Sequence, residues 1–195
     1  DTQCQPIVAQ RIDSVGYIKI STFTKPIASE FYTVYKELGD VKSLVIDLRD
    51  NGGGYVTGAI DLTSLFLSKG DVIMTRVSKQ REIVFDTKRD GTLKDIPLVV
   101  IINENTASAS ETFAGAIQDH DRGIIIGRNS YGKGLIQKYI VNKDGSGLTI
   151  TTAQEKTPSG RPIQRPYTRG EGDAYCSDST RYAHPDSIPR DTSLI

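Results

Sequence analysis

The sequence predicts an α/β domain in which helices cover a β-sheet, and three observations support this prediction. Apolar runs of strand length alternate along the chain with segments whose apolar residues recur at helical spacing. Glycines and other turn residues follow most of these segments, as expected where elements end. The length of 195 residues suits one domain with a single hydrophobic core.

The first third of the chain contains two predicted strands and a helix. Residues 1–13 are polar and are predicted to be a lead-in segment. Residues 15–20 (VGYIKI) are typical of a strand, and the helical spacing that starts at Pro26 ends at Gly39. Residues 43–48 (SLVIDL) are mostly apolar and β-branched, which favours a strand covered on both faces.

The middle of the chain continues the alternation. A glycine-rich turn at 50–54 (DNGGG) leads into a predicted helix at 57–69. Residues 72–77 and 81–85 resemble the two strands of a hairpin. Residues 97–102 form a fully apolar run, which predicts a buried strand.

A serine-rich segment opens the second half of the chain. Ser108 leads into a helical pattern, and a second apolar run follows at 123–127. Residues 138–141 and 148–154 flank the turn sequence NKDGSG, so a second hairpin is expected there.

The expected core spans residues 14–168. The polar stretch 169–195 is predicted to be a long loop, a partly mobile segment or a truncated continuation of the domain. The two cysteines, Cys4 and Cys176, lie near opposite ends and lack metal-type spacing. They either pair in an oxidising compartment or are two unrelated thiols. No cofactor and no metal site are expected.

Composition narrows the classes of partner. Lysine plus arginine number 24 and aspartate plus glutamate also number 24, so the net charge gives no reason to expect a nucleic-acid or anionic-membrane partner. No apolar run approaches the roughly 20 residues that a membrane-spanning helix needs. The chain starts at Asp1 without an initiator methionine or an apolar leader, so we expect a mature product or an excised piece.

The sequence Ser108-Ala109-Ser110-Glu111 has two interpretations. It fits a capping box, in which a serine caps a helix and the glutamate three residues later accepts a hydrogen bond from the cap amide. The same geometry suits catalysis, because a hydroxyl at a helix N-terminus lies beside unpaired N–H groups that stabilise a developing oxyanion. Taken alone, this segment favours the capping interpretation.

A catalytic serine needs a general base. His120 lies on the same predicted helix as Ser108, about 18 Å away at a rise of 1.5 Å per residue, which is out of reach. His184 is in the polar tail, so a Ser-His-Asp triad is not expected. Lys133 is the remaining candidate for the general base, and its neighbours Gly132 and Gly134 let the backbone approach other segments closely. Burial must lower the ordinary lysine pKa of about 10.4 before this amine can accept a proton. The alternative is a solvated turn lysine.

The DNGGG turn at residues 50–54 exposes backbone amides just before a predicted helix. It is either an ordinary turn with an N-cap, or an anion-binding site such as the second half of an oxyanion hole. A phosphate-binding loop is not favoured, because no Gly-Lys-Ser/Thr sequence follows it.

In their order along the chain, these motifs resemble those of the C-terminal processing peptidases, also called tail-specific proteases, which use a Ser-Lys dyad. Their combination is far more specific than any single motif. The matching segments are VGYIKISTF (15–23), VIDLRDNGGG (45–54), ENTASASETFAGAIQDH (104–120), GRNSYGKGLIQ (127–137) and GLTITTAQEKTPSGRPIQ (147–164).

The resemblance implies a role for each matching residue. Of the three alternating hydroxyls of Thr106, Ser108 and Ser110, it implies Ser108 as the nucleophile. It implies Lys133 as the general base and Gln137 as the residue that orients this lysine.

The resemblance also implies an oxyanion hole and a supporting set of residues. The expected oxyanion donors are the N–H of Ala109 and a glycine amide of the NGGG turn, that of Gly53. Asp119 lies about three turns from the serine on the helix, so a direct hydrogen bond between them is not expected. The implied supporting residues are Gly54, Glu111, Asp119 and Ser130.

The implied fold is the α/β core shared with crotonases and Clp proteases, with helices packed on a mixed β-sheet. The implied activity is cofactor-free endoproteolysis of protein substrates near their C-terminus, in the periplasm or cell envelope of a bacterium. Whether the protein forms a homo-oligomer is left open by the sequence. The alternatives are a non-catalytic peptide- or ligand-binding module on the same fold, and a hydrolase of small esters or amides.

The chain departs from the family pattern in two places. Members commonly carry a peptide-binding PDZ domain, and the residues before Val15 are too few for one. The segment 170–195 matches no motif of the family. We therefore expect a catalytic core cut from a longer chain.

Overall fold

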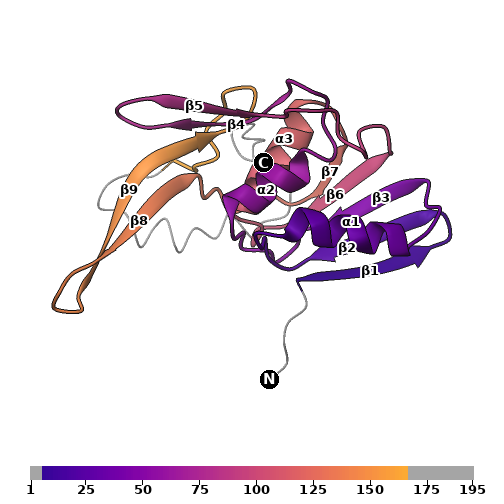
Figure 1. The fold of residues 1–195 in the computed structure, drawn as a ribbon, viewed down its shortest axis with the longest axis horizontal. Helices are drawn as coiled ribbons and strands as arrows, with labels where there is room; N and C mark the ends of the chain where they lie inside the picture. Colours follow the sequence, from indigo (N-terminus) through magenta and orange to yellow (C-terminus); the bar gives the residue numbers. More distant parts are fainter. Residues whose placement is uncertain (1–5, 167–195) are drawn as a thin grey trace.

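The computed structural model describes residues 6–166, which form two β-sheets and three helices (Figure 1). Cys4, Cys176, His184 and the tail 169–195 lie outside the described residues. Within the described part, no helix has the length and apolar character needed to cross a membrane.

The first sheet has five strands in the order β1-β2-β3-β6-β7. The pair β1–β2 is antiparallel, whereas β2–β3, β3–β6 and β6–β7 are parallel, so the sheet is mixed, as expected from the resemblance. Its strands are β1 (Ile7–Ile12), β2 (Val15–Ile20), β3 (Ser43–Asp47), β6 (Leu98–Ile102) and β7 (Ile124–Gly127).

Strand β1 corrects the expectation that residues 1–13 only lead into the domain. It pairs along its whole length with β2, from Ile7 opposite Ile20 to Ile12 opposite Val15. Only Ile7 of its six residues is buried. The strand therefore shows almost no apolar alternation, and its pairing depends on the free edge of β2.

Three helices, α1 (Ile27–Glu37), α2 (Val56–Thr63) and α3 (Ala109–Asp119), lie on one face of this sheet (Figure 1). On β3, Leu44 and Ile46 point to the helices and are fully buried, whereas Val45 on the opposite face is half-buried. The face of β3 opposite the helices is therefore only partly covered, since Val45 is partly exposed although Asp47 on the same face is fully buried.

Helix α2 is shorter than the helix predicted at 57–69. After Thr63 the chain tightens, with the N–H of Leu65 and Phe66 donating to carbonyls three residues back. Phe66 nevertheless keeps its place in the core. Its ring packs edge-on against Phe31 and Phe113, with centroids 5.8 and 5.9 Å away.

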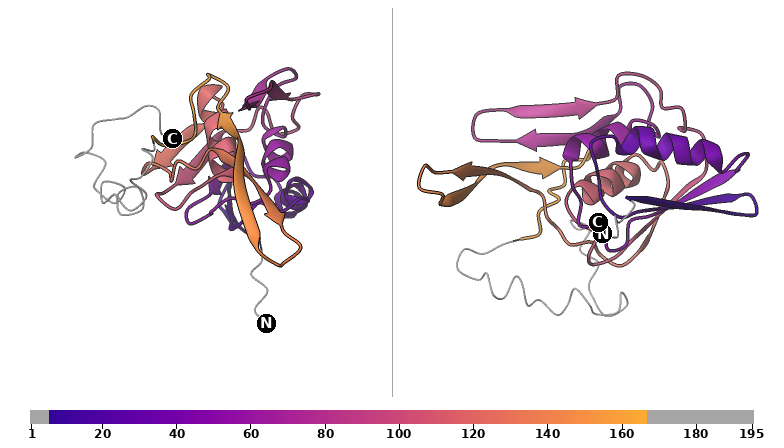
Figure 2. Two further views of the ribbon diagram at one scale, coloured as in Figure 1. Left: turned by 90° about the vertical axis from the view of Figure 1, so that its left-hand side faces the viewer. Right: turned by 60° about the horizontal axis from the view of Figure 1, so that its bottom comes forward.

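The second sheet has four strands in the order β5-β4-β9-β8. Both predicted hairpins are present, and Figure 2 shows the β8–β9 hairpin extending away from the rest of the described chain. Contacts of Leu67, Ile73 and Met74 with Ala116 attach this sheet to α3. The strands are β4 (Val72–Val77), β5 (Glu82–Asp86), β8 (Leu135–Val141) and β9 (Gly147–Lys156).

Candidate active site

Ser108 lies in the turn between β6 and α3, at the N-terminus of the helix. Its backbone has φ 58° and ψ −119°, a left-handed conformation that is rare for residues other than glycine. The capping box expected from the sequence is formed between Ser108 and Glu111. The Ser108 backbone nevertheless differs from the extended backbone that a capping serine ordinarily has. A strained backbone at a strand-to-helix turn is typical of serine nucleophiles, because it exposes the serine hydroxyl.

The three hydroxyls of this segment have different environments. Thr106 Oγ1 donates to the Leu48 carbonyl at 2.9 Å, and Ser110 Oγ donates to the Asn51 carbonyl at 3.1 Å. Both side chains are fully buried, whereas Ser108 is partly exposed. Of the three, Ser108 is therefore the one whose hydroxyl a substrate can reach.

Glu111 connects the serine turn to the lysine loop. Its Oε2 accepts from the N–H of Ser108 at 2.7 Å and from the N–H of Lys133 at 2.9 Å. Its Oε1 accepts from Ser130 Oγ at 2.6 Å and from the Gly132 N–H at 2.5 Å. Because one oxygen binds both amides, the sum of its two distances is an upper limit for the separation of the Ser108 and Lys133 nitrogens.

Burial raises the pKa of the Glu111 carboxyl above its usual value, and the hydrogen bonds from Ser130, Lys133, Gly132 and Ser108 oppose this rise. The carboxyl is almost completely enclosed. It therefore depends on its four donors for the stability that water would otherwise supply.

The Gly-Lys-Gly loop is enclosed on its other side by residues 163–165. A Cβ on Gly132 would lie 2.7 Å from Arg165 Cβ, and one on Gly134 would lie 2.5 Å from the Gln164 nitrogen. The Arg165 N–H also donates to the Gly132 carbonyl at 3.0 Å. The two glycines therefore permit the close backbone approach that the sequence predicted, and the backbone of the loop is enclosed.

The side chain of Lys133, by contrast, is exposed. Within residues 6–166 its amine makes no hydrogen bond or ion pair, and the expected dry pocket around it is not formed. The backbone N–H of Lys133 is hydrogen-bonded to Glu111, whereas its side chain extends into solvent. The structure thus holds the backbone of Lys133 in place and leaves its amine in solvent.

The DNGGG turn packs directly against the serine turn. A Cβ on Gly53 would lie 2.8 Å from Ser108 Cβ and 3.0 Å from the Ala109 nitrogen. Asp50 helps to hold the two segments together, since Oδ1 of this residue accepts from the side-chain amides of Asn103 and Asn105, each at 2.9 Å. Two loops that are far apart in the sequence therefore meet at Ser108.

The amides of these two loops are not equally available. The N–H of Ala109 has no acceptor within the described residues, as expected of an oxyanion donor. The N–H of Gly53 already donates to Asn51 Oδ1 at 2.9 Å. The neighbouring Gly54 has φ 140° and lies against the Phe23 main chain, so a side chain there would collide with the Phe23 carbonyl.

Gln137 and Asp119 lie apart from the serine. Gln137 is exposed on β8 beside a bulge, and no contact with the lysine is formed in the described structure. Asp119 binds the Ser159 N–H at 2.9 Å and forms an ion pair with Arg161. Burial raises the pKa of Asp119, but bonds from Ser159, Thr157 and Arg161 outweigh it, so the net pKa is lowered. Asp119 thus anchors the 157–161 turn to α3.

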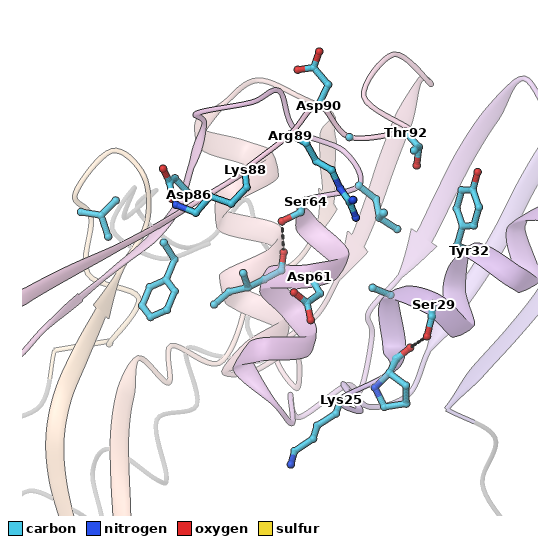
Figure 3. Close-up of a pocket in the computed structure, with 17 residues that line it drawn as sticks. Lys25, Ser29, Tyr32, Asp61, Ser64, Asp86, Lys88, Arg89, Asp90 and Thr92 are labelled. Atoms are coloured by element: carbon cyan, nitrogen blue, oxygen red, sulfur yellow. Dashed lines mark hydrogen bonds and ion pairs between the residues drawn. The ribbon is translucent and has the colours of Figure 1, made fainter.

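A large open groove lies elsewhere, between the start of α1, α2 and residues 84–92 (Figure 3). Its volume is about 1030 Å³, and neither Ser108 nor Lys133 lines it. Asp61, Arg89 and Lys25 are among its charged residues. Groove size alone would therefore have pointed away from the serine. No group of three His, Cys, Asp or Glu side chains in residues 6–166 is arranged to hold a metal ion.

Two residues near the site escaped the reasoning from sequence. Asn51 is fully buried and positions the glycine turn, with Nδ2 donating to the Ile20 carbonyl at 2.8 Å. Glu155 is a buried carboxylate on β9 that contacts α3 through Thr112. Glu155 is flanked by Gln154 and Lys156, so the local sequence gave no signal of its burial.

Comparisons with known proteins identify the family to which the chain is similar. Residues 14–170 match peptidase family S41. The carboxy-terminal-processing protease of Bartonella bacilliformis is 40% identical over 157 residues, which are 77% of this chain and 36% of that protein. The chloroplastic C-terminal processing peptidase of Tetradesmus obliquus is 34% identical over 84% of this chain and 37% of its own length.

The fold comparison points to the same group. The structure of a photosystem II D1 C-terminal processing protease matches with a TM-score of 0.74 and 30% identity, over 82% of this chain and 46% of that one. The chain thus spans less than half the length of each of these relatives. With the family match covering most of its residues, the chain belongs to peptidase family S41.

Proposed function

We propose that this chain contains the catalytic centre of a serine endopeptidase that cleaves protein substrates near their C-terminus through a Ser108–Lys133 dyad. The observation that supports it best is the single Glu111 oxygen that binds the amides of both residues. The names of the relatives point to the same substrate class.

In the proposed reaction the neutral Lys133 amine accepts the Ser108 hydroxyl proton as the oxygen attacks the peptide carbonyl carbon. The oxyanion that forms is stabilised by the Ala109 N–H and by a glycine amide of the 52–54 turn. The carbon–nitrogen bond then breaks, and the lysine ammonium returns its proton to the leaving amine. An ester joins the substrate acyl group to Ser108.

Water completes the cycle. It attacks the ester carbonyl and gives a proton to Lys133, the bond to Ser108 Oγ breaks, and the serine oxygen recovers its proton from the lysine. Two rearrangements are required relative to this structure. The exposed Lys133 amine has to swing toward Ser108, and Gly53 has to share or release its bond to Asn51. Free enzymes often hold catalytic groups apart in this way. Gln137 would orient the amine once it has turned inward.

A fluorophosphonate that labels reactive serines tests the proposal. In the full-length protein, Ser108→Ala and Lys133→Ala should each abolish labelling and peptide cleavage without lowering the unfolding temperature, because both side chains reach solvent. The matched control Ser110→Ala should keep labelling and lose about 1 kcal/mol of stability with its buried hydrogen bond. Labelling that survives Ser108→Ala would refute the assignment.

The exposed Lys133 amine is the one observation that favours a second function, a peptide-binding module without catalysis. That module would bind peptides equally well with or without the Ser108 hydroxyl and would not react with the probe. An esterase of small molecules would instead react but show no preference for peptides with a free carboxylate. A site of action outside the cytoplasm stays a prediction; the named relatives include bacterial and chloroplastic proteins.

A further inference from the structure

Glu155 is a buried carboxylate that the proposed reaction does not use. It lies on β9 with 2% of its surface exposed. Oε2 accepts from Thr112 Oγ1 at 3.2 Å, and Oε1 has no hydrogen-bond partner among the described residues. Arg76, its register partner on β4, also leaves its buried Nε without one. A buried carboxylate oxygen without a donor costs free energy, so such a residue calls for an explanation other than stability.

The main chain of Glu155 holds the loop that carries the lysine. Its N–H donates to the Gly134 carbonyl at 2.7 Å, next to Lys133, and its carbonyl accepts from the Ile163 N–H at 3.2 Å. Strand β8, which begins directly after Gly134, pairs with β9 along its whole length. Any sliding of β9 therefore moves the lysine with it.

The side chain of Glu155 holds the helix that carries the serine. Thr112, its hydrogen-bond partner, lies in the first turns of α3, and the Thr112 N–H donates to the Ser108 carbonyl at 3.0 Å. The Glu155–Thr112 bond is thus a short connection from the second sheet to the serine turn. The other polar connection of this helix to the chain that follows β9, through Asp119, lies at the far end of α3.

We propose that Glu155 is a positioning residue that fixes β9 against α3 and so sets where Lys133 stands relative to Ser108. The inference rests on the proposed dyad. Its physical reason is that a displacement of about 1 Å in a reacting pair can reduce a rate about 10²-fold, while a single buried hydrogen bond contributes little to overall stability. A buried charged pair can often be replaced as a whole by apolar residues without loss of stability, whereas removal of one partner destabilises the fold.

The charge state of Glu155 agrees with this view. Burial, and then the nearby Glu111 carboxylate, raise its pKa, whereas the Thr112 hydroxyl and the Arg76 charge oppose the rise. The folded state therefore holds this carboxylate at a cost. A neutral side chain of similar size should be tolerated by the fold, and only the reaction should depend on the hydrogen bond.

Four variants of the full-length protein test the role: Glu155→Leu, Thr112→Val, the double variant and Glu155→Gln. We expect each of the first two to lower kcat and the fluorophosphonate labelling rate roughly 10- to 100-fold with KM unchanged, at a temperature where every variant is folded. The double variant should be no slower than either single one, because both remove one bond. Glu155→Gln keeps an acceptor for Thr112 and should restore most of the rate.

Glu82→Leu, an exposed glutamate on β5 of the same sheet, is the control and should behave as wild type. Wild-type rates in Glu155→Leu, additive losses in the double variant, or no recovery in Glu155→Gln would overturn the positioning role. So would rate losses that only follow a lowered unfolding temperature. A wild-type protein that is neither labelled nor active would instead overturn the proposed dyad itself.

Discussion

Replacing Gly53 by alanine tests the contact between the two loops at Ser108. The added Cβ would lie 2.7 Å from the Ala107 carbonyl oxygen, 2.8 Å from Ser108 Cβ and 3.0 Å from the Ala109 nitrogen. Real Cβ atoms do not approach other atoms so closely, so the serine turn has to shift. The Gly53 backbone, at φ 100°, is also unsuited to a side chain.

The structure gives the size of the effect. A residue held in a disfavoured backbone conformation costs roughly 1–3 kcal/mol, and each kcal/mol lowers the unfolding temperature of a chain of this size by about 2–4 °C. Displacing the Ala109 N–H from the oxyanion removes about one donor, which corresponds to a loss of roughly 10²–10³ in kcat. The loss of activity should therefore greatly exceed the loss of stability.

Gly52 provides the matched control. A Cβ there has no atom within 4 Å and Gly52 is not among the positive-φ residues, so Gly52→Ala should keep both activity and stability. Cleavage of a peptide with a free C-terminal carboxylate and thermal unfolding measure the two effects. If Gly53→Ala kept the wild-type kcat, the packing of this glycine against the candidate nucleophile would have no role in the reaction. Equal damage by Gly52→Ala would show that chain flexibility, and not these contacts, matters.

Three further predictions concern the surroundings of the dyad. Gly132 and Gly145 share a left-handed backbone, with φ 83° and 84°, but of the two only Gly132 has close neighbours around an added Cβ. Gly132→Ala should therefore lower both the unfolding temperature and the activity, whereas Gly145→Ala should lower the stability by only about 1 kcal/mol. Equal effects of the two variants in thermal melts would contradict this packing argument. Asp119→Asn removes the ion pair that anchors the 157–161 turn and should lower stability by about 1–3 kcal/mol without changing the labelling rate of the folded protein; a slowed label at full stability would give this residue a direct part in the chemistry. Because burial and then the charge of Glu111 raise the pKa of Glu155, the folded state binds that proton more tightly than the unfolded chain does. The contribution of this carboxyl to the free energy of unfolding is complete below the usual glutamate pKa of about 4.3 and is lost as pH rises through the raised pKa. Urea denaturation should therefore show that Glu155→Gln gains stability relative to wild type as pH rises across that interval. A difference in stability that does not change with pH would contradict the raised pKa of Glu155.

Several features of the site follow from local sequence. The α/β class, the helix that begins after Ser108 and the two hairpins are given by apolar periodicity and turn residues, which depend on near neighbours only. The resemblance also singled out Ser108 among three alternating hydroxyls. The structure supplies a reason, because the hydroxyls of Thr106 and Ser110 donate hydrogen bonds to backbone carbonyls. The glycines beside Lys133 were correctly read as places of close backbone approach.

Other features depend on contacts between distant segments. Residues 7–12 form strand β1 by pairing with the edge of β2, although their own sequence carries little apolar signal. The pairing of β4 with β9 buries Glu155 against α3, more than 40 residues from Thr112 in sequence. Periodicity tells which face of an element is buried but not which segment covers it, so neither contact was predictable.

By itself, then, the sequence determined the family and the order of the elements after residue 13, because these are properties of local spacing and of motifs in a fixed order. Only the tertiary structure decided that Glu111 joins the Ser108 and Lys133 amides, that the Gly53 amide is engaged by Asn51, and that the lysine amine stays in solvent. Hydrogen bonds and burial are set by which groups packing brings within about 3 Å, and that distance is not written in the spacing of residues along the chain.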